Sequence, residues 1–326
     1  MRFIAQRLVQ MLAVLFVVTF LTFGLVRVLP GDPAISILGT TQDQAEKDPA
    51  TRERVAELRE RLDLDEPVHV AYALWLKNLL IDRDLGYSEI RQTEVSELLG
   101  TALPRSILLM VYSIGLSLIL AIPLGILAAY RQGGWIDKAL SSTAFGLISL
   151  PSFIIAILLV YVFAVQLDWL PASGVVDFSD DPVEHFRSYL LPALALALPQ
   201  AAAYMRVLRT DMIATLQEDF IGTAKAKGMP PRTILLRHAF RPSSFTLLTV
   251  TALTIGQLIG GTVIIEFIFN INGMGSQLAG ALGRSDYIVV QSAVAIIAVF
   301  FVLINFTVDI FYGLIDPRIR HVRGRA

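Results

Sequence analysis

The stretch DFIGTAKAKGMPPRTILLRHAFRPS, Asp219–Ser243, is a basic segment with many small residues that lies between two apolar runs of the chain. The four residues before it, Thr215–Glu218, match the Ser/Thr-x-x-Glu capping box of a helix start, so we expect a short helix over residues 219–227. Gly228 suits the left-handed residue that ends a helix, and Pro231 suits the first turn of the next helix. The stretch therefore predicts a rigid helical hairpin.

The first helix of this hairpin is predicted to have a low surface. Four small residues lie close together on it: Gly222, Thr223, Ala224 and Ala226. With so little bulk, the backbone of another protein can approach the helix closely. The alternative is an ordinary basic loop that contacts anionic lipid, whose charge only follows the orientation rule for membrane proteins. The defined turn favours a docking element, because a loop that only touches lipid headgroups needs no fixed turn.

The composition excludes an ordinary soluble fold. Of the 326 residues, 55% are hydrophobic and 17% are charged, whereas soluble domains are about 45–50% apolar and about 25% charged. The chain has no cysteine, which excludes disulfides, iron–sulfur clusters and cysteine-ligated zinc. The composition therefore indicates a membrane protein, which we expect to be all-α because of the long apolar stretches described next.

Six stretches are apolar enough to cross a bilayer, which takes about 20 residues per helix. They are Leu8–Leu29, Ser106–Tyr130, Ala139–Val165, Tyr189–Leu208, Phe245–Phe269 and Ile288–Ile315. The alternative for the first stretch is a cleaved signal peptide, but its apolar core is longer than the 7–15 residues of such a peptide. We therefore expect six spans.

Basic residues gather on one side of the six expected spans. They are Arg2, Arg7, Arg131, Lys138, Arg206, Arg209, Lys225, Lys227, Arg232, Arg237, Arg241, Arg318, Arg320, Arg323 and Arg325. Lys and Arg beside spans mark the cytoplasmic side. The opposite side carries the acidic segment DFSDDPVEHF, residues 177–186. We therefore expect both termini in the cytoplasm.

The spans divide the chain into four parts. These are residues 1–29 with the first span, an external helical insertion over 30–105, a five-span core over 106–315 that contains the hairpin at 215–242, and a basic tail over 316–326. Within the insertion, helices are predicted from Asp48-Pro49, from Val68 and over Glu94–Leu99. The insertion is either a small cap over the spans or a docking surface for an external partner.

Catalytic, metal and nucleotide sites find no support in the sequence. The four histidines, His69, His185, His238 and His321, lie outside the expected spans, which excludes haem ligation within the bilayer. No Walker A loop and no H-E-x-x-H motif occurs. We therefore expect a chain that is not an enzyme and has no catalytic residue, cofactor or metal of its own.

Polar residues in the spans are mostly uncharged. Asp309 and Glu266 lie near span ends, where we interpret them as capping or packing residues and not as ion-coupling sites. The other polar candidates are Ser149, Ser152, Gln200, Tyr204, Gln257, Gln291 and Asn305. Such side chains either line a weakly selective path or hydrogen-bond one helix to another. Both interpretations stay open.

The hairpin sequence resembles a known signature. GTAKAKG, followed after nine residues by HAF, resembles the signature of permeases in binding-protein-dependent ABC importers, in their dipeptide/oligopeptide branch. The matching residues are Thr223, Ala224, Ala226, Lys227, Gly228, Arg237, His238, Ala239 and Arg241. Gly222 departs from the general signature, which has Glu at that position.

The resemblance extends over most of the chain. The segments LPGDPA, LRERLDLDEPV, YALWLKNLL and DLGYS, within residues 29–88, are similar to the loop after the first span in that branch. GQLIGGTVIIEFIFNINGMG and SDYIVVQ, within residues 256–291, are similar to its fifth-to-sixth span region. Asn272 and Ile288 depart from the branch, which usually has Pro at these positions.

The resemblance implies a type I ABC importer permease in a bacterial or archaeal cytoplasmic membrane. Its implied partners are a second permease subunit, two cytoplasmic ATPases that hold ATP and Mg, and an external solute-binding protein. The hairpin would be the coupling helix that docks on one ATPase. The residues implied in this contact are Asp219, Phe220, Gly222, Thr223, Ala224, Ala226, Lys227, Gly228, Arg237 and His238.

The cargo implied by the branch is a dipeptide or oligopeptide, although relatives are associated with nickel, glutathione or oligosaccharides. Two other function classes remain as alternatives. An autonomous secondary transporter or channel predicts mid-span charges and internal repeats, and a membrane-embedded enzyme predicts ligating residues within the spans. The sequence shows none of these features.

Overall fold

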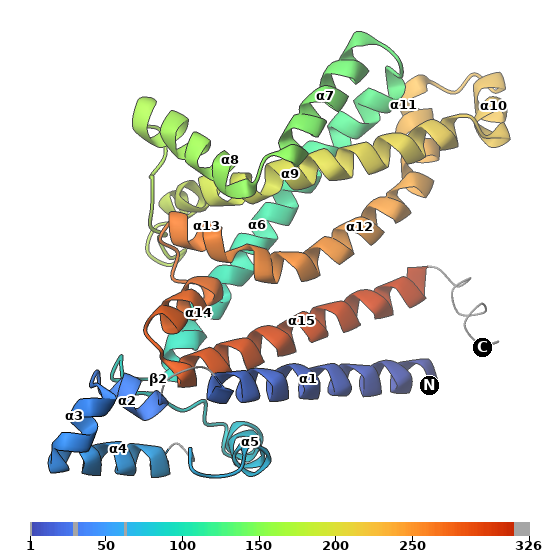
Figure 1. Ribbon diagram of the computed structural model, residues 1–326. Coiled ribbons are helices and arrows are strands. Elements are labelled where there is room, and N and C mark those ends of the chain that lie inside the picture. The colour runs from blue at the N-terminus through green and yellow to red at the C-terminus, as the bar shows by residue number, and fades with distance from the viewer. Residues whose placement is uncertain (1, 29–31, 62–63, 316–326) are drawn as a thin grey trace. The chain divides into compact units, whose positions relative to one another are not determined.

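The computed structural model describes residues 2–28, 32–61 and 64–315. These residues are mostly helical, with one short two-stranded sheet (Figure 1). They form two compact units, one of the described residues up to 104 with 272–307 and one of residues 105–271 with 308–315. The basic tail predicted over 316–326 and the residues 29–31 at the end of the first predicted span lie outside the described residues.

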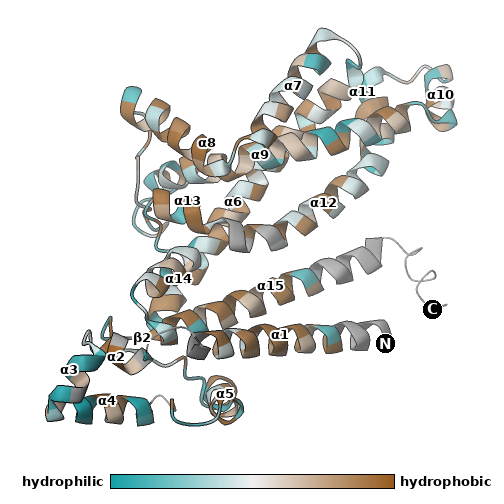
Figure 2. Cartoon of the chain, in the orientation of Figure 1, coloured by the Kyte–Doolittle hydropathy of each residue, from teal (hydrophilic) through white to brown (hydrophobic). Residues whose placement is uncertain are grey.

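The first unit holds the N-terminal helices and the C-terminal span. Its elements are α1 Arg2–Val28, α2 Pro33–Ile37, α3 Gln42–Lys47, α4 Pro49–Arg61, α5 Val68–Lys77, the π-helix η1 Asn78–Asp82, β1 Tyr87–Ser88, β2 Thr93–Glu94, the first turns of α6 Val95–Tyr130, α14 Met274–Gly283, and α15 Tyr287–Ile315 as far as Thr307. Figure 2 shows hydrophilic residues along α3 and α4 and apolar residues along most of α1. Helices α3 and α4 are therefore more polar than α1.

Two predicted starts within the insertion are confirmed. The Asp48 carboxylate accepts hydrogen bonds from the backbone N–H groups of Ala50 (3.3 Å) and Thr51 (3.2 Å), which caps α4. The Thr51 hydroxyl also donates to this carboxylate (2.5 Å) and, as the main cause, lowers the pKa of Asp48. Helix α5 begins at Val68, and its Tyr72 hydroxyl lies 2.8 Å from Thr19 Oγ1 of α1.

The predicted short helix over Glu94–Leu99 is wrong as a separate element. Glu94 ends strand β2, and the residues from Val95 are the first turns of the 36-residue helix α6. The reason is that Val95 and Leu99 are both buried, which continues the apolar face of α6 beyond the predicted start of the span.

The β-hairpin of the first unit is fastened to α14 and α15. Ser88 Oγ donates to the buried Asp286 carboxylate (2.5 Å), and Arg91 Nη1 donates to Gln277 Oε1 (2.5 Å). Burial, together with the nearby charge of Arg284, lowers the pKa of Arg91. The β-hairpin is thus held by polar contacts to α14 and to the residue before α15.

The second unit holds the helices from the middle of the chain. Its elements are the remainder of α6, α7 Trp135–Ser149, α8 Ser152–Leu159, the π-helix η2 Val160–Gln166, α9 Pro182–Leu216, α10 Asp219–Ala226, α11 Pro231–Thr233, the π-helix η3 Ile234–Ala239, α12 Phe240–Gly261 and α13 Val263–Ile268. Helix α9 packs against α7, α8 and α12 and is the central helix of this unit.

The third predicted span, Ala139–Val165, is not one straight helix. It is broken at Leu150–Pro151, and the two pieces, Trp135–Ser149 and Ser152–Gln166, meet at 104°. Pro151 has no backbone N–H and disfavours helical geometry in the residue before it. Leu150 accordingly has extended backbone angles, φ −91° and ψ 129°.

Helix α9 is longer than the predicted span Tyr189–Leu208 and runs from Pro182 to Leu216. The Asp181 side chain caps its first turn, and Pro182 occupies the first helical position. The predicted fifth span, Phe245–Phe269, is likewise divided at Thr262 into α12 and α13.

Within the described residues, four helices are long and apolar enough to cross a membrane. They are Leu8–Leu25 of α1, all of α6, all of α9 and Tyr287–Thr307 of α15, and the bent α7–α8 pair is a fifth candidate if it forms one span. The chain is therefore a multi-pass membrane protein with four or five candidate spans in its described part.

Candidate functional site

The segment quoted first, residues 219–243, folds as a hairpin of α10, a turn, α11 and η3. Gly228 has φ +74°, which confirms the predicted left-handed helix end. The N–H of Gly228 donates to Lys225 O (2.9 Å), and the N–H of Met229 donates to Ala224 O (3.2 Å). A Cβ added at Gly228 would meet no atom within 4 Å, so the backbone conformation alone favours glycine here.

The predicted capping box at Thr215–Glu218 is wrong. Thr215 is still part of α9, and its Oγ1 lies 3.1 Å from Ser243 Oγ of α12. Glu218 takes the cap position of α10 without a side-chain hydrogen bond. The reason is that Ser243 is buried at the α9–α12 contact and offers the Thr215 hydroxyl a partner there.

The hairpin has its own small core. Ile221 and Ile234 are buried against each other's helices, and Met229 of the turn packs beside them. Ala224 belongs to this core and is only 5% exposed, so the prediction that it lies on the open surface is wrong. With the period of a helix, Ile221 and Ala224 share the inner face of α10.

The other predicted contact residues of α10, and those just after its end, lie on the outer side of the hairpin. The exposed ones are Asp219, Phe220, Gly222, Thr223, Ala226, Lys227 and Gly228. Phe220 is a large aromatic side chain and is 48% exposed. Arg237 is exposed on η3, and His238 is half-buried. The hairpin thus presents a surface of small residues with the Phe220 ring beside it. The core of Ile221, Ala224 and Ile234 lies on the opposite face of α10.

The predicted path residues do not form one group in the structure. Ser149 and Ser152 lie on either side of the α7–α8 bend, and Ser149 Oγ donates to Phe145 O (2.8 Å). Gln200 and Tyr204 lie one turn apart on α9, where Tyr204 is buried. The Oε1 atom of Gln200 is buried and accepts no hydrogen bond from the described residues.

The remaining path candidates are on other helices. Gln291 is half-buried on α15, and Asn305 Nδ2 donates to Phe301 O (2.8 Å) within the same helix. The side chain of Gln257 and that of Asp309 lie outside the described residues. The Asn305 contact favours helix-internal hydrogen bonding at that position over a path.

Glu266 is a packing carboxylate, in agreement with its interpretation from the sequence. It is 0% exposed and accepts hydrogen bonds from Ser106 Oγ (2.7 Å) and Thr262 Oγ1 (3.0 Å). Its contacts join α13 to α6 inside the second unit. Among the described residues, no group of three or more His, Asp and Glu side chains is placed to hold a metal ion.

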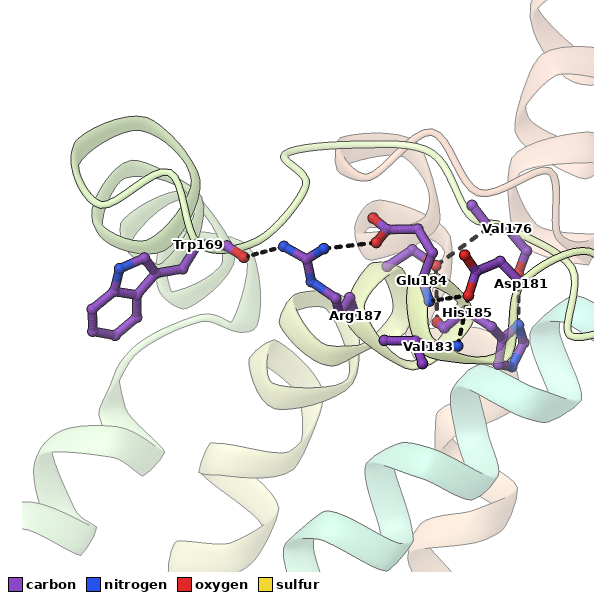
Figure 3. A network of polar contacts seen from close by, with 8 residues as sticks. Trp169, Val176, Asp181, Val183, Glu184, His185 and Arg187 are labelled. Atoms are coloured by element: carbon purple, nitrogen blue, oxygen red, sulfur yellow. Dashed lines mark hydrogen bonds and ion pairs between the residues drawn. The ribbon is translucent and has the colours of Figure 1, made fainter.

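His185 was expected outside the spans, but it is a buried residue in the first turn of α9, a helix that is a candidate span over its whole length (Figure 3). Its Nδ1 donates to Val176 O (2.6 Å), and its Nε2 lies 2.9 Å from Tyr112 Oη of α6. Beside it, Arg187 donates to Glu184 (2.8 Å) and to Trp169 O (2.7 Å).

These contacts tie the loop after η2 to the first turns of α9. The sequence contains a signal for the start of α9. It is the pair Asp181-Pro182, the same pair of residue types that marks the start of α4 at Asp48-Pro49.

Two family models match this chain. Residues 121–321 match the family model described as binding-protein-dependent transport system inner membrane component. Residues 1–109 match the model for the N-terminal part of such membrane components. The first match alone spans more than half of the chain.

Full-length relatives agree with this match. A putative peptide transport system permease protein of Brucella abortus is 39% identical over 318 residues, which cover 98% of each chain. A probable peptide ABC transporter permease protein of Sinorhizobium fredii is 37% identical, over 98% of this chain and 99% of the relative. The dipeptide transport system permease protein DppB of Alkalihalophilus pseudofirmus is 33% identical, over 97% and 98%.

Proposed function

Because the chain belongs to the family of binding-protein-dependent transport system inner membrane components, we propose that it is the peptide-importing permease subunit of an ATP-driven ABC transporter. The names of its full-length relatives support peptides as the cargo. Nickel, glutathione and oligosaccharides remain the alternatives among cargoes. As a permease, the chain is a transport subunit and not an enzyme.

The proposed transporter contains further subunits. Two cytoplasmic ATPases bind ATP and Mg, a second permease of the same family completes the path, and an external solute-binding protein delivers the cargo. This chain crosses the membrane six times, with both termini in the cytoplasm and residues 30–105 outside. The positive-inside distribution of Lys and Arg supports this orientation.

The hairpin of residues 219–239 is the proposed coupling element. The single observation that carries this role is that a small core of Ile221, Ala224 and Ile234, which Leu216 at the end of α9 also contacts, leaves a small-residue face exposed. Because this core joins α10 to η3 and to the end of α9, movement of the hairpin by the ATPase is passed on to α9. Binding of ATP then shifts the population of the permease, because ATP favours the closed ATPase pair to which the hairpin is attached.

Gly222 offers a sharp test of this role. It is exposed in the middle of α10, and a Cβ added there would meet no atom within 4 Å. Gly222→Ala should therefore keep the hairpin folded and stabilise it by up to about 1 kcal/mol, because alanine is a better helix former. Gly222→Trp should also keep the hairpin folded but should hold the ATPase away.

The measurement is peptide uptake and co-purification of the ATPase at equal amounts of permease in the membrane. We expect near-normal values for Gly222→Ala and loss of both for Gly222→Trp. Normal uptake and normal ATPase binding with Gly222→Trp would show that this face does not dock on the ATPase.

A further inference from the structure

Two arginines of α9, one turn apart, both reach α7. Arg209 Nε and Nη2 donate to Asp137 Oδ1 and Oδ2, at 2.5 and 2.7 Å. The guanidinium carbon of Arg206 lies 4.1 Å from the centroid of the Phe145 ring. The half of α9 nearer the hairpin is therefore attached to α7 at two points about two turns apart along α7.

Asp137 is a buried hydrogen-bond acceptor and not a surface charge. Its side chain is 4% exposed, and it lies in the first turn of α7, where a carboxylate is favoured. Besides Arg209, it accepts hydrogen bonds from the N–H of Gly133 (2.8 Å) and the hydroxyl of Ser141 (3.4 Å). One carboxylate thus joins the α6–α7 turn, α7 and α9.

The paired contact is of the kind that fixes geometry. A guanidinium and a carboxylate with two parallel hydrogen bonds resist both sliding and rotation, because either movement breaks a bond. Apolar side chains at the same contact can slide past each other. A buried carboxylate that loses its partner is also strongly unfavourable, so the two helices are held in one register.

On α9, the pair lies between the hairpin at the end of the helix and Pro199 within it. Arg209 is seven residues before Leu216, where α9 ends and the hairpin begins, which is about 10 Å along a helix. On the other side of the pair, Pro199 interrupts the hydrogen bonding of α9 and makes bending easier there. Along α7, the helix ends at the 104° bend of Leu150–Pro151.

We propose that Asp137 and Arg209 form the joint through which movement of the hairpin reaches α7 and the bend after it. This inference rests on the proposed coupling role of the hairpin. Asp137 and Arg209 act as positioning residues, and they touch neither cargo nor nucleotide. Without the joint, the hairpin still docks on its ATPase, but α7 no longer follows it.

The test measures the distance between two spin labels on either side of the α7–α8 bend. Spin labels are placed at Ser142→Cys on α7 and Ile157→Cys on α8, two exposed positions in a chain with no cysteine of its own. Their distance is measured in the assembled transporter, with and without a non-hydrolysable ATP analogue. We expect the analogue to change this distance when Asp137 and Arg209 are intact.

Two variants remove the joint in different ways. Asp137→Asn keeps the shape of the side chain and an acceptor for Gly133 but loses the charge, and Arg209→Lys keeps the charge but loses the planar fork. We expect either variant to keep the nucleotide-free distance and the bound ATPase, and to lose the change caused by the analogue. Lys47→Gln is the matched control, because its ion pair with Asp43 lies within α3 alone and joins no second helix.

The outcomes separate this inference from the proposed function. The inference is wrong if the ATPase is bound but the analogue changes no distance while Asp137 and Arg209 are intact. It is also wrong if the distance change persists in Asp137→Asn and Arg209→Lys. If these variants change the nucleotide-free distance or lower the amount of permease without affecting the change, the pair is only structural and the inference is overturned. If the unaltered chain binds no ATPase, the proposed function itself fails.

Discussion

At the scale of single residues, the hairpin separates side chains that hold it together from side chains that face outward. Ala224 and Ala226 are only two positions apart and identical in type, yet Ala224 is buried against Ile221 and Ile234 while Ala226 is exposed. Small size therefore has two uses in this segment, tight packing inside and close approach outside.

This difference predicts opposite results for one substitution at two positions. Ala224→Asp buries an unpaired carboxylate in an apolar core, which costs several kcal/mol, or forces the hairpin to open. Ala226→Asp leaves the carboxylate in solvent and should change the stability of the hairpin by less than about 0.5 kcal/mol. Hydrogen exchange of the backbone N–H groups over residues 219–239 measures both effects. Equal protection in the two variants would contradict the assignment of Ala224 to the core.

The sequence identified the residues of the hairpin but not their orientation. Gly228 could be predicted, because only a left-handed residue ends a helix in this way and glycine adopts that conformation at least cost. The role of Ala224 could not, because a helical period defines faces but does not say which face packs on the same chain. The contact of Thr215 with Ser243 is set by tertiary structure and overrides a good local capping pattern.

At the scale of elements, the breaks within helices could not be predicted from hydropathy. The break at Leu150–Pro151 interrupts a run that is apolar throughout, so hydropathy alone joined its two halves. The proline was the available signal, as it was at Pro231, where polar residues around it made the turn evident. The fusion of residues 95–105 with α6 was missed for the opposite reason, since the interior of the first unit buries Val95 and Leu99 before the apolar run begins.

The bend should depend on Pro151. Pro151→Ala restores a backbone N–H and frees Leu150 to become helical, so α7 and α8 gain a straighter alternative. We expect the distance between spin labels at Ser142→Cys and Ile157→Cys to become longer in a part of the molecules. Pro192→Ala in α9 is the control, because that helix continues through Pro192 without a break. An unchanged distance distribution in Pro151→Ala would mean that tertiary packing and not the proline sets the bend.

At the scale of the whole molecule, the family and the membrane class could be predicted, because composition and ordered motifs extend over most of the chain. The complete set of spans could not be established in the same way. Helices α12 and α13 together cover the predicted fifth span but are divided at Thr262, and no described part of them meets the length and hydropathy of a span. The partners could not be established either, because a docking surface is defined by the partner that binds it and the sequence of one chain does not contain that partner.

The central claim is that the outer face of the hairpin docks on an ATPase, and single cysteines test it most directly. The chain has no cysteine, so Ala226→Cys and Ala224→Cys differ only in the face of α10 that carries the thiol. In the assembled transporter, a short thiol-to-amine crosslinker should join the permease to the ATPase through Ala226→Cys and not through Ala224→Cys. Failure of Ala226→Cys to crosslink in every nucleotide state, with its thiol fully open to a water-soluble reagent, would contradict the account.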